Sequence, residues 1–130
     1  MADRELVIKV IAMPRDANPD GDIFGGWLVG QMDLAAYYFA RKRTESKIVT
    51  VAQDNIVIHR PVSIGDCVLC YAQLERVGTT SVTVRIDALV ERRLGKNTES
   101  VTEGRFTLVA IDNDRRPVRF TSNPASAREG

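Results

Sequence analysis

Histidine and cysteine are scarce in this sequence, which limits the metal and redox chemistry that it can support. Its 130 residues include one histidine, His59, and two cysteines, Cys67 and Cys70. The spacing Cys-x-x-Cys can form half of a zinc site or a redox pair. However, the segment 67–74 is typical of a buried strand, in which residues three apart point to opposite faces. We therefore predict two unreactive packed thiols and no metal site.

An excess of one charge and long apolar runs are also missing. The chain carries 18 lysines and arginines against 17 aspartates and glutamates, a net charge of +1. Proteins that bind nucleic acid mainly through its phosphates normally show a marked basic excess, so we expect no nucleic-acid partner. No apolar run reaches the ~20 residues of a membrane helix, and the first five residues lack the apolar core of a signal peptide. We therefore expect a cytoplasmic protein with no membrane partner. The near-neutral net charge still allows a small basic pocket for a phosphorylated ligand.

The length of the chain and the spacing of its apolar residues predict one domain with one helix and five strands. We place the domain at residues 5–118 and expect a flexible C-terminal tail at 119–130. Segments rich in β-branched and apolar residues predict strands at residues 5–12, 48–59, 67–77, 82–91 and 101–111. Residues 24–43 predict a helix. One long helix and about five antiparallel strands indicate an α+β fold, a curved sheet wrapped around the helix.

The helical segment is almost uniformly apolar and carries three glycines. Between residues 23 and 40 apolar side chains occur nearly all round the predicted helix, as expected for a helix surrounded by protein. Gly25 and Gly26 fall in its first turn, where backbone N–H groups can face a ligand oxygen because no Cβ stands in the way. We expect Asp22 to cap or charge the start of the helix, and Gly30 to allow the close approach of a neighbouring backbone.

Asp33 is the only charged residue in this apolar span. An isolated buried carboxylate is costly, so we expect it to be paired, hydrogen-bonded, protonated or functional. It lies about 12 Å beyond Gly25 along a helix, too far for one helix to place both groups on one reacting atom. A second, antiparallel copy of the helix would bring the two together, which predicts a site shared across a two-fold dimer. The alternative is that Asp33 bonds to backbone groups at a dimer interface.

Several segments together resemble one known family. The longest runs from Ala12 to Asp33 and contains the pattern Asn-x-x-Gly-Asp-x-x-Gly-Gly, followed by an acid on the helix. Shorter matching segments lie at residues 49–52, 61–66, 77–78 and 106–113. From about residue 6 to residue 113 the sequence resembles the YciA-type acyl-CoA thioesterases of the hot-dog superfamily. The resemblance implies a five-stranded antiparallel sheet wrapped around one long central helix. It also implies a homo-oligomer, either a dimer or a hexamer built as a trimer of dimers.

The resemblance implies an enzyme of lipid metabolism that hydrolyses acyl-CoA to a carboxylic acid and CoA, with no cofactor beyond the CoA of substrate and product. Asp33 matches the catalytic acid of the family, which acts as general base for water or as nucleophile. Asn18 matches the loop asparagine that positions the water or thioester from the other protomer, although the loop composition alone favours a turn residue. Gly25, with Gly26 beside it, matches the donor of backbone N–H groups to the thioester carbonyl.

Further polar residues are candidates to support the reaction or to bind CoA. Thr50 and Asp54 are expected on one face of the strand after the helix, where they would support the site or simply form a polar pair facing the sheet. CoA carries several phosphates, so we expect local cations despite the near-neutral total. The candidate substrate-binding residues are Arg60, Thr79, Thr80 and Ser81. The nearby Arg92, Arg93 and Lys96 are equally typical of a solvated charged surface.

Two other functions stay open. A non-catalytic acyl-CoA-binding or regulatory hot-dog module would bind the same ligand without turnover. A hot-dog acyl thioester hydratase or dehydratase would need a catalytic histidine near the helix start, where this sequence has Phe24. Release of free thiol from acyl-CoA, and its dependence on Asp33, separates hydrolysis from binding alone.

Overall fold

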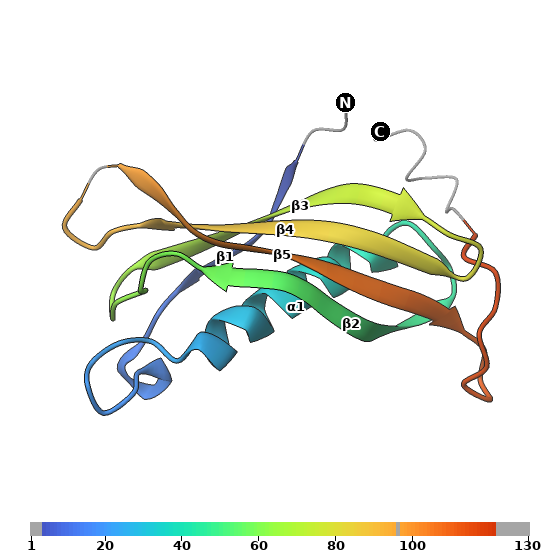
Figure 1. Cartoon of the computed structure of the whole chain (residues 1–130), viewed down its shortest axis with the longest axis horizontal. Coiled ribbons are helices and arrows are strands. Elements are labelled where there is room, and N and C mark those ends of the chain that lie inside the picture. The colour runs from blue at the N-terminus through green and yellow to red at the C-terminus, as the bar shows by residue number, and fades with distance from the viewer. Residues whose placement is uncertain (1–3, 96, 122–130) are drawn as a thin grey trace.

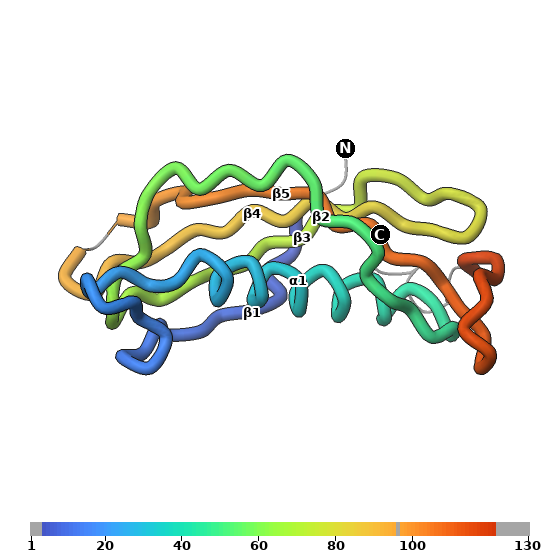
Figure 2. The backbone as a smooth tube through the Cα atoms, turned by 60° about the horizontal axis from the view of Figure 1, so that its bottom comes forward, coloured from blue at the N-terminus to red at the C-terminus, as the bar shows by residue number. Residues whose placement is uncertain are grey.

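Five strands and one long helix make up the described part of the chain, residues 4–95 and 97–121 of a computed structural model. The elements are β1 (Glu5–Ile11), the 3₁₀ helix η1 (Pro14–Asp16), α1 (Gly25–Arg41), β2 (Lys47–Ile58), β3 (Cys67–Val77), β4 (Ser81–Glu91) and β5 (Thr98–Ile111). The strands pair antiparallel in the order β1-β3-β4-β5-β2. The sheet curves around α1, which lies along its inner face (Figure 1; Figure 2). The predicted α+β hot-dog fold is confirmed.

The core lies between the inner face of the sheet and one side of α1. Along β4 every second residue is buried, so the strand turns an apolar row toward the helix. The row consists of Val82, Val84, Ile86, Ala88 and Val90. The matching stripe on α1 consists of Leu28, Met32, Ala35, Ala36, Phe39 and Ala40. Burial of one large apolar side chain contributes about 2 kcal/mol, so this packing, more than helix propensity, holds α1 in place.

In the described part of the chain, no helix is long and apolar enough to cross a membrane.

The opposite side of α1 is bare in the single chain, contrary to the expected helix surrounded by protein. Leu34 is 56% exposed and Tyr38 is 49% exposed. Beside them, β2 forms an edge of the sheet, and its Ile58, which pairs with the buried Thr102 and reaches the start of α1, is also exposed. An edge strand leaves backbone N–H and C=O groups unpaired, which makes it a template for pairing with another chain. Helix and edge strand together present one apolar surface, which we call the bare face.

β2 departs from regular strand geometry at two points. Its register against β5 shifts between Thr50 and Ala52, and again between Asp54 and Val57. Each extra residue in a bulge changes which face of the sheet the following side chains occupy. In the second bulge a Cβ at Gly104 of β5 would lie 2.8 Å from Cγ1 of Ile56, closer than carbon atoms normally approach. Glycine at position 104 therefore leaves the space that the Ile56 side chain fills.

The β2–β3 loop lies at the end of the sheet where α1 begins (Figure 1). Asp66 in this loop ties it to the end of β4. Its buried carboxylate accepts hydrogen bonds from the backbone amides of Ser63 (2.9 Å) and Arg93 (3.1 Å) and from Nη1 of Arg92 (2.8 Å). Burial alone would raise the pKa of Asp66, but these hydrogen bonds and the charge of Arg92 bring the pKa below its usual value. Arg92 is thus a structural residue, whereas Lys96 lies outside the described residues.

The ordered domain extends past the predicted boundary at residue 118. Phe120 is buried in the core, and its amide donates to the carbonyl of Thr79 at 2.8 Å. Val118 is anchored in the same way by a 2.9 Å hydrogen bond to Ala110. Phe120, which falls in the predicted tail, thus packs against the domain, while the flexibility of the tail stays a prediction. Residues 122–130 of the predicted tail lie outside the described residues.

Candidate active site

The loop before α1 is held in a tight turn by Asn18. Its side-chain Oδ1 accepts hydrogen bonds from the backbone amides of Asp20 (2.9 Å) and Asp22 (3.1 Å). Its own backbone amide donates to the carbonyl of Asp22 at 2.6 Å. Asn18 therefore fills the turn role that the loop composition favours. With Oδ1 engaged in this way, any contact of the Asn18 side chain with a ligand uses Nδ2, which only donates.

The start of α1 leaves backbone donors unused. Phe24 is the N-cap residue and provides no side-chain hydrogen bond to the helix. Of the two roles predicted for Asp22, capping is wrong, because the N-cap position falls two residues later, at Phe24, and no side chain caps the helix. Within the described residues, no acceptor is found for the amides of Gly25 and Gly26. The helix dipole makes such amides favourable partners for a negatively charged oxygen.

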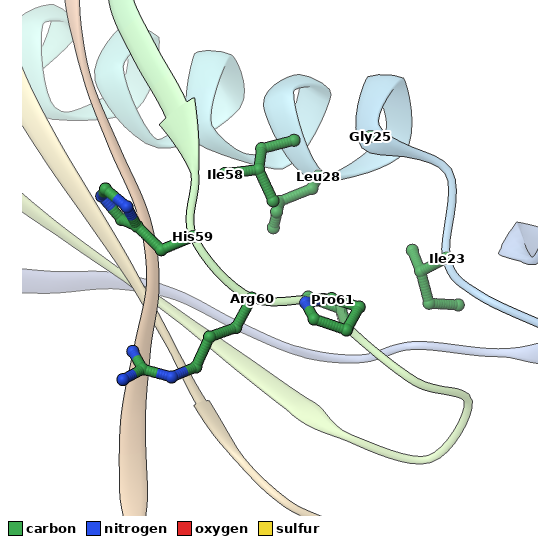
Figure 3. Close-up of a pocket in the computed structure, with 8 residues that line it drawn as sticks. Ile23, Gly25, Leu28, Ile58, His59, Arg60 and Pro61 are labelled. Carbon is green, nitrogen blue, oxygen red and sulfur yellow. The ribbon is translucent and has the colours of Figure 1, made fainter.

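A cavity of about 250 Å³ opens beside these amides (Figure 3). Its lining residues are Ile23, Gly25, Leu28, Ile58, His59, Arg60, Pro61 and Val62. Ile58, at the end of β2, lies over the helix start, and a Cβ on Gly25 would come within 3.2 Å of its Cδ1. A larger side chain at position 25 would therefore narrow the cavity beside the free amides. Sequence analysis missed this role of Ile58, since no spacing pattern links it to Gly25.

Asp33 and Thr50 are brought together by the packing of α1 against β2. Asp33 is half-buried near the middle of the helix, and its Oδ1 accepts a 2.7 Å hydrogen bond from Oγ1 of Thr50. This bond offsets part of the cost of removing the carboxylate from water. Within the described residues no hydrogen bond engages Oδ2 of Asp33. One carboxylate oxygen is thus oriented by Thr50 and the other is available to a water or a ligand.

Asp54 does not share a face with Thr50, so that part of the prediction is wrong. Thr50 pairs with Leu108, a core residue, and points toward α1. Asp54 pairs with Arg105, on the outer face of the sheet. The bulge after Thr50 adds one residue, which reverses the alternation expected for a regular strand. Asp54 therefore lies away from Asp33.

The remaining predicted residues fall at opposite ends of one chain. Arg60 lines the cavity at the helix start and donates from Nη1 to the carbonyl of Ser100 at 2.7 Å. Thr79, Thr80 and Ser81 form the turn between β3 and β4. That turn lies at the other end of the sheet, about 30 Å away along β4. Asp33 lies near the middle of α1, between these two ends, and it does not border the cavity at Gly25. A single chain therefore does not bring the predicted groups together.

The one histidine and the two cysteines lie apart from Asp33, and each contacts residues of the sheet. His59 follows β2, and its Nε2 lies 3.1 Å from Oε1 of Glu103. Cys67 and Cys70 both lie on β3 and form no disulfide. Cys70 faces the core and burial raises the pKa of its thiol to about 12, so it stays protonated and unreactive.

Comparison with known proteins identifies relatives along most of the chain. The thioesterase superfamily matches residues 20–94. The acyl-CoA thioester hydrolase YciA of Salmonella typhimurium is 40% identical over 117 residues, which cover 87% of this chain and 87% of that protein. An uncharacterised acyl-CoA thioester hydrolase of Zymomonas mobilis is 45% identical over 113 residues, covering 87% of this chain and 76% of that protein. The structure of the hexameric thioesterase y2039 from Yersinia pestis has a TM-score of 0.87 at 38% identity, covering 94% of this chain and 99% of that one.

These matches agree with each other in fold and in the region that they cover. The matched residues 20–94 include all of α1 and the strands β2, β3 and β4. They confirm the resemblance found in the sequence. The chain belongs to the thioesterase superfamily and is a YciA-type thioesterase of the hot-dog fold.

Proposed function

We propose that this protein hydrolyses acyl-CoA thioesters to a carboxylic acid and free CoA. The observation that carries the proposal is the uncapped start of α1, where Gly25 lines a cavity, on the same helix as Asp33, whose carboxylate is hydrogen-bonded to Thr50 of β2. Thioester hydrolysis needs this combination of a carboxylate and donors for a developing oxyanion. The relatives named as acyl-CoA thioester hydrolases support acyl-CoA as the substrate.

The proposed chemistry assigns one role to each group. Asp33 takes a proton from a water molecule, whose oxygen attacks the thioester carbonyl carbon. The carbonyl oxygen gains negative charge and accepts hydrogen bonds from the amides of Gly25 and Gly26. The C–S bond then breaks, and the CoA sulfur leaves with the proton that Asp33 held. In the alternative route Asp33 attacks directly and forms an anhydride that water hydrolyses. Neither route uses a cofactor.

A second copy of the chain completes the proposed site. Asp33 and Gly25 are about 12 Å apart along one helix, too far to act on the same thioester. A two-fold dimer with antiparallel helices places Asp33 of one protomer opposite Gly25 of its partner. The same dimer covers the bare face, including Leu34 and Tyr38, and pairs the two β2 edges. The hexameric relative from Yersinia pestis supports an assembly built from such dimers.

Thiol release from a panel of acyl-CoA esters tests the proposal. We expect the wild-type protein to release free CoA and Asp33→Ala to lower kcat about a hundredfold or more, the usual contribution of a general base. Glu91→Ala, which removes an exposed carboxylate at the end of β4 that is ion-paired only with Lys9, is the matched control and should keep wild-type activity. An Asp33→Ala protein as active as the wild type would refute the assignment. Tight binding of acyl-CoA without turnover by the wild type would instead favour the regulatory module.

A further inference from the structure

The cavity at the start of α1 has an apolar interior. Its polar lining side chains are engaged elsewhere: Nε2 of His59 lies 3.1 Å from Oε1 of Glu103, and Arg60 donates to the carbonyl of Ser100. Its volume of about 250 Å³ is below the about 300–1,000 Å³ that is usual for sites of drug-sized ligands. The buried lining residues, each 8% exposed or less, are Ile23, Leu28 and Val62. The cavity therefore suits a small apolar group.

Ile58 is the lining side chain that approaches the position of a Cβ on Gly25. A Cβ built there would lie 3.2 Å from Cδ1 of Ile58 and, apart from the chain neighbours of Gly25, would meet nothing else within 4 Å among the described residues. Figure 3 shows the Ile58 side chain directed from β2 toward the first turn of the helix. In a helix both the Cα–Cβ direction and the free N–H groups of the first turn point toward the N-terminus. Ile58 thus lies on the side of Gly25 where its unused amide can bind an oxygen.

This position places Ile58 beside the carbonyl end of a bound acyl group, a step that rests on the proposed function. A thioester oxygen that accepts from the Gly25 amide lies about 2.9 Å from its nitrogen. The carbonyl carbon and the first carbon of the acyl group then lie within reach of Cδ1 of Ile58. The acyl group is the apolar substituent of that carbonyl, so the apolar cavity favours it over the polar arm of CoA.

We infer that Ile58 is a specificity-determining residue that excludes acyl groups branched next to the carbonyl. A straight chain presents a methylene to Cδ1 of Ile58, whereas a chain branched at this carbon presents an additional methyl group. The group cannot shift away from Ile58 freely, because the oxygen is held by the amides and Asp33 of the partner subunit must reach the same carbonyl carbon. The extra methyl group therefore meets Ile58 when the thioester is in its reactive position.

Two isomeric substrates and two graded variants test this inference. Butyryl-CoA and isobutyryl-CoA have the same atoms and differ only in the branch next to the carbonyl. Ile58→Val removes Cδ1 alone, and Ile58→Ala removes every atom beyond Cβ. Ile58 is 46% exposed, so neither change leaves a closed cavity in the core. Val57→Ala, which shortens the neighbouring 51% exposed side chain on the other face of β2, is the matched control.

The readout is the kcat/KM for isobutyryl-CoA divided by the kcat/KM for butyryl-CoA. The intrinsic difference in reactivity between the isomers is the same for every variant, so a change in this ratio reports the shape of the site. We expect Ile58→Ala to raise the ratio about tenfold or more, Ile58→Val to give an intermediate value and Val57→Ala to match the wild type. An unchanged ratio in Ile58→Ala overturns the inference. Equal loss of activity on both isomers also overturns it, since Ile58 would then contact the arm of CoA or act only in folding.

Binding of inert analogues separates this inference from the proposed function. In the dethia analogues of the two esters a methylene replaces the thioester sulfur, so they bind without being cleaved. Calorimetric titration should show that Ile58→Ala narrows the difference in Kd between the butyryl and isobutyryl analogues, while Val57→Ala keeps it. A wild type that releases no thiol but shows this dependence on Ile58 would refute hydrolysis and leave the role of Ile58 in place. A difference in Kd that is the same in the wild type and Ile58→Ala would contradict that role.

Discussion

The residues of the candidate site differ in how much bonding capacity the fold has already used. Both oxygens of Asp66 accept hydrogen bonds from neighbouring loops, and its burial closes the carboxylate to a ligand. Asp33 has one oxygen engaged by Thr50, and Asn18 has its carbonyl oxygen engaged by the turn. Each of these two keeps one group available while being held in position. A reacting side chain needs both properties. One of its polar groups is hydrogen-bonded, which fixes its orientation, and the other stays free to bind the substrate or water.

Thr50 is predicted to act as a positioning residue for Asp33. Thr50→Val keeps the shape of the side chain and removes the 2.7 Å hydrogen bond to Asp33. A hydrogen bond to a charged group is worth about 2 kcal/mol, so kcat for thiol release should fall roughly thirtyfold with little change in KM. Thr50→Ser, which retains the hydroxyl, should keep most of the activity. Equal activity of the valine and serine variants would show that the hydrogen bond does not matter.

At the scale of residues, the sequence correctly predicted that the isolated Asp33 is hydrogen-bonded, but it failed where backbone geometry decided which way a side chain points. Asp33 was conspicuous as the single charge in an apolar span, and its partner Thr50 was a candidate as well. Asp54 was placed on the wrong face because a bulge leaves no mark in a single sequence. The positive φ of Arg115 went unnoticed for a similar reason, since it depends on a turn that residue types alone do not specify.

At the scale of elements, the predicted strands and helix agree with the structure to within a few residues. The alternating valines of β4 determine both its extent and its buried face, because a period of two has one interpretation when one face is apolar. Sheet order was not predicted, since the pairing of β5 with both β4 and β2 depends on contacts distant in sequence.

The loops at the end where α1 begins are connected through Asp66, which joins the β2–β3 loop to the end of β4.

This connection predicts an acid-sensitive stability. Because the pKa of Asp66 is lower in the folded chain than its unfolded value of about 3.9, its contribution is complete above that value. The contribution is lost as pH falls through the lower, folded-state pKa. Asp66→Asn should lower the free energy of unfolding at neutral pH by about 3 kcal/mol, and should flatten the pH dependence below about pH 5.

Urea unfolding followed at a series of pH values measures this effect. Asp114→Asn, a change to an exposed carboxylate in the turn after β5, is the control and should follow the wild type throughout. If the stability of Asp66→Asn declines with acid as steeply as that of the wild type, the acid sensitivity has another origin.

At the scale of the whole molecule, the chain offers two incomplete halves of a site. The uncapped amides and the cavity lie at the start of α1, and Asp33 lies about two helical turns further along. The bare face runs along the same helix and along β2. In the proposed two-fold dimer, pairing over that face covers the exposed apolar surface and assembles the two halves of the site in one step. Under this arrangement neither catalysis nor stability is a property of a single chain.

Mixed oligomers test whether the site is shared. Asp33→Ala removes the carboxylate, and Gly25→Leu fills the cavity beneath Ile58; each protein alone should be inactive. When the two are co-refolded in equal amounts, half of the dimers are mixed and each contains one intact site. Thiol release should then recover to about one quarter of the wild-type rate.

A matched mixture gives the control for this experiment. Asp33 and Thr50 belong to the same half of the site, so mixing Asp33→Ala with Thr50→Val should give no more activity than the average of the two separate proteins. No recovery in the Asp33→Ala and Gly25→Leu mixture, despite mixed dimers shown by mass spectrometry, would place both groups of the site within one chain.

The uncapped start of α1 also implies a compromise between stability and activity. An aspartate, serine or threonine in place of Phe24 would supply the missing cap and strengthen the helix by about 1 kcal/mol. That same side chain would occupy the amides that a thioester oxygen is proposed to use, so the helix gives up some of its own stability to keep them vacant. The start of α1 is therefore a place where a mutation selected for heat resistance would be expected to cost turnover.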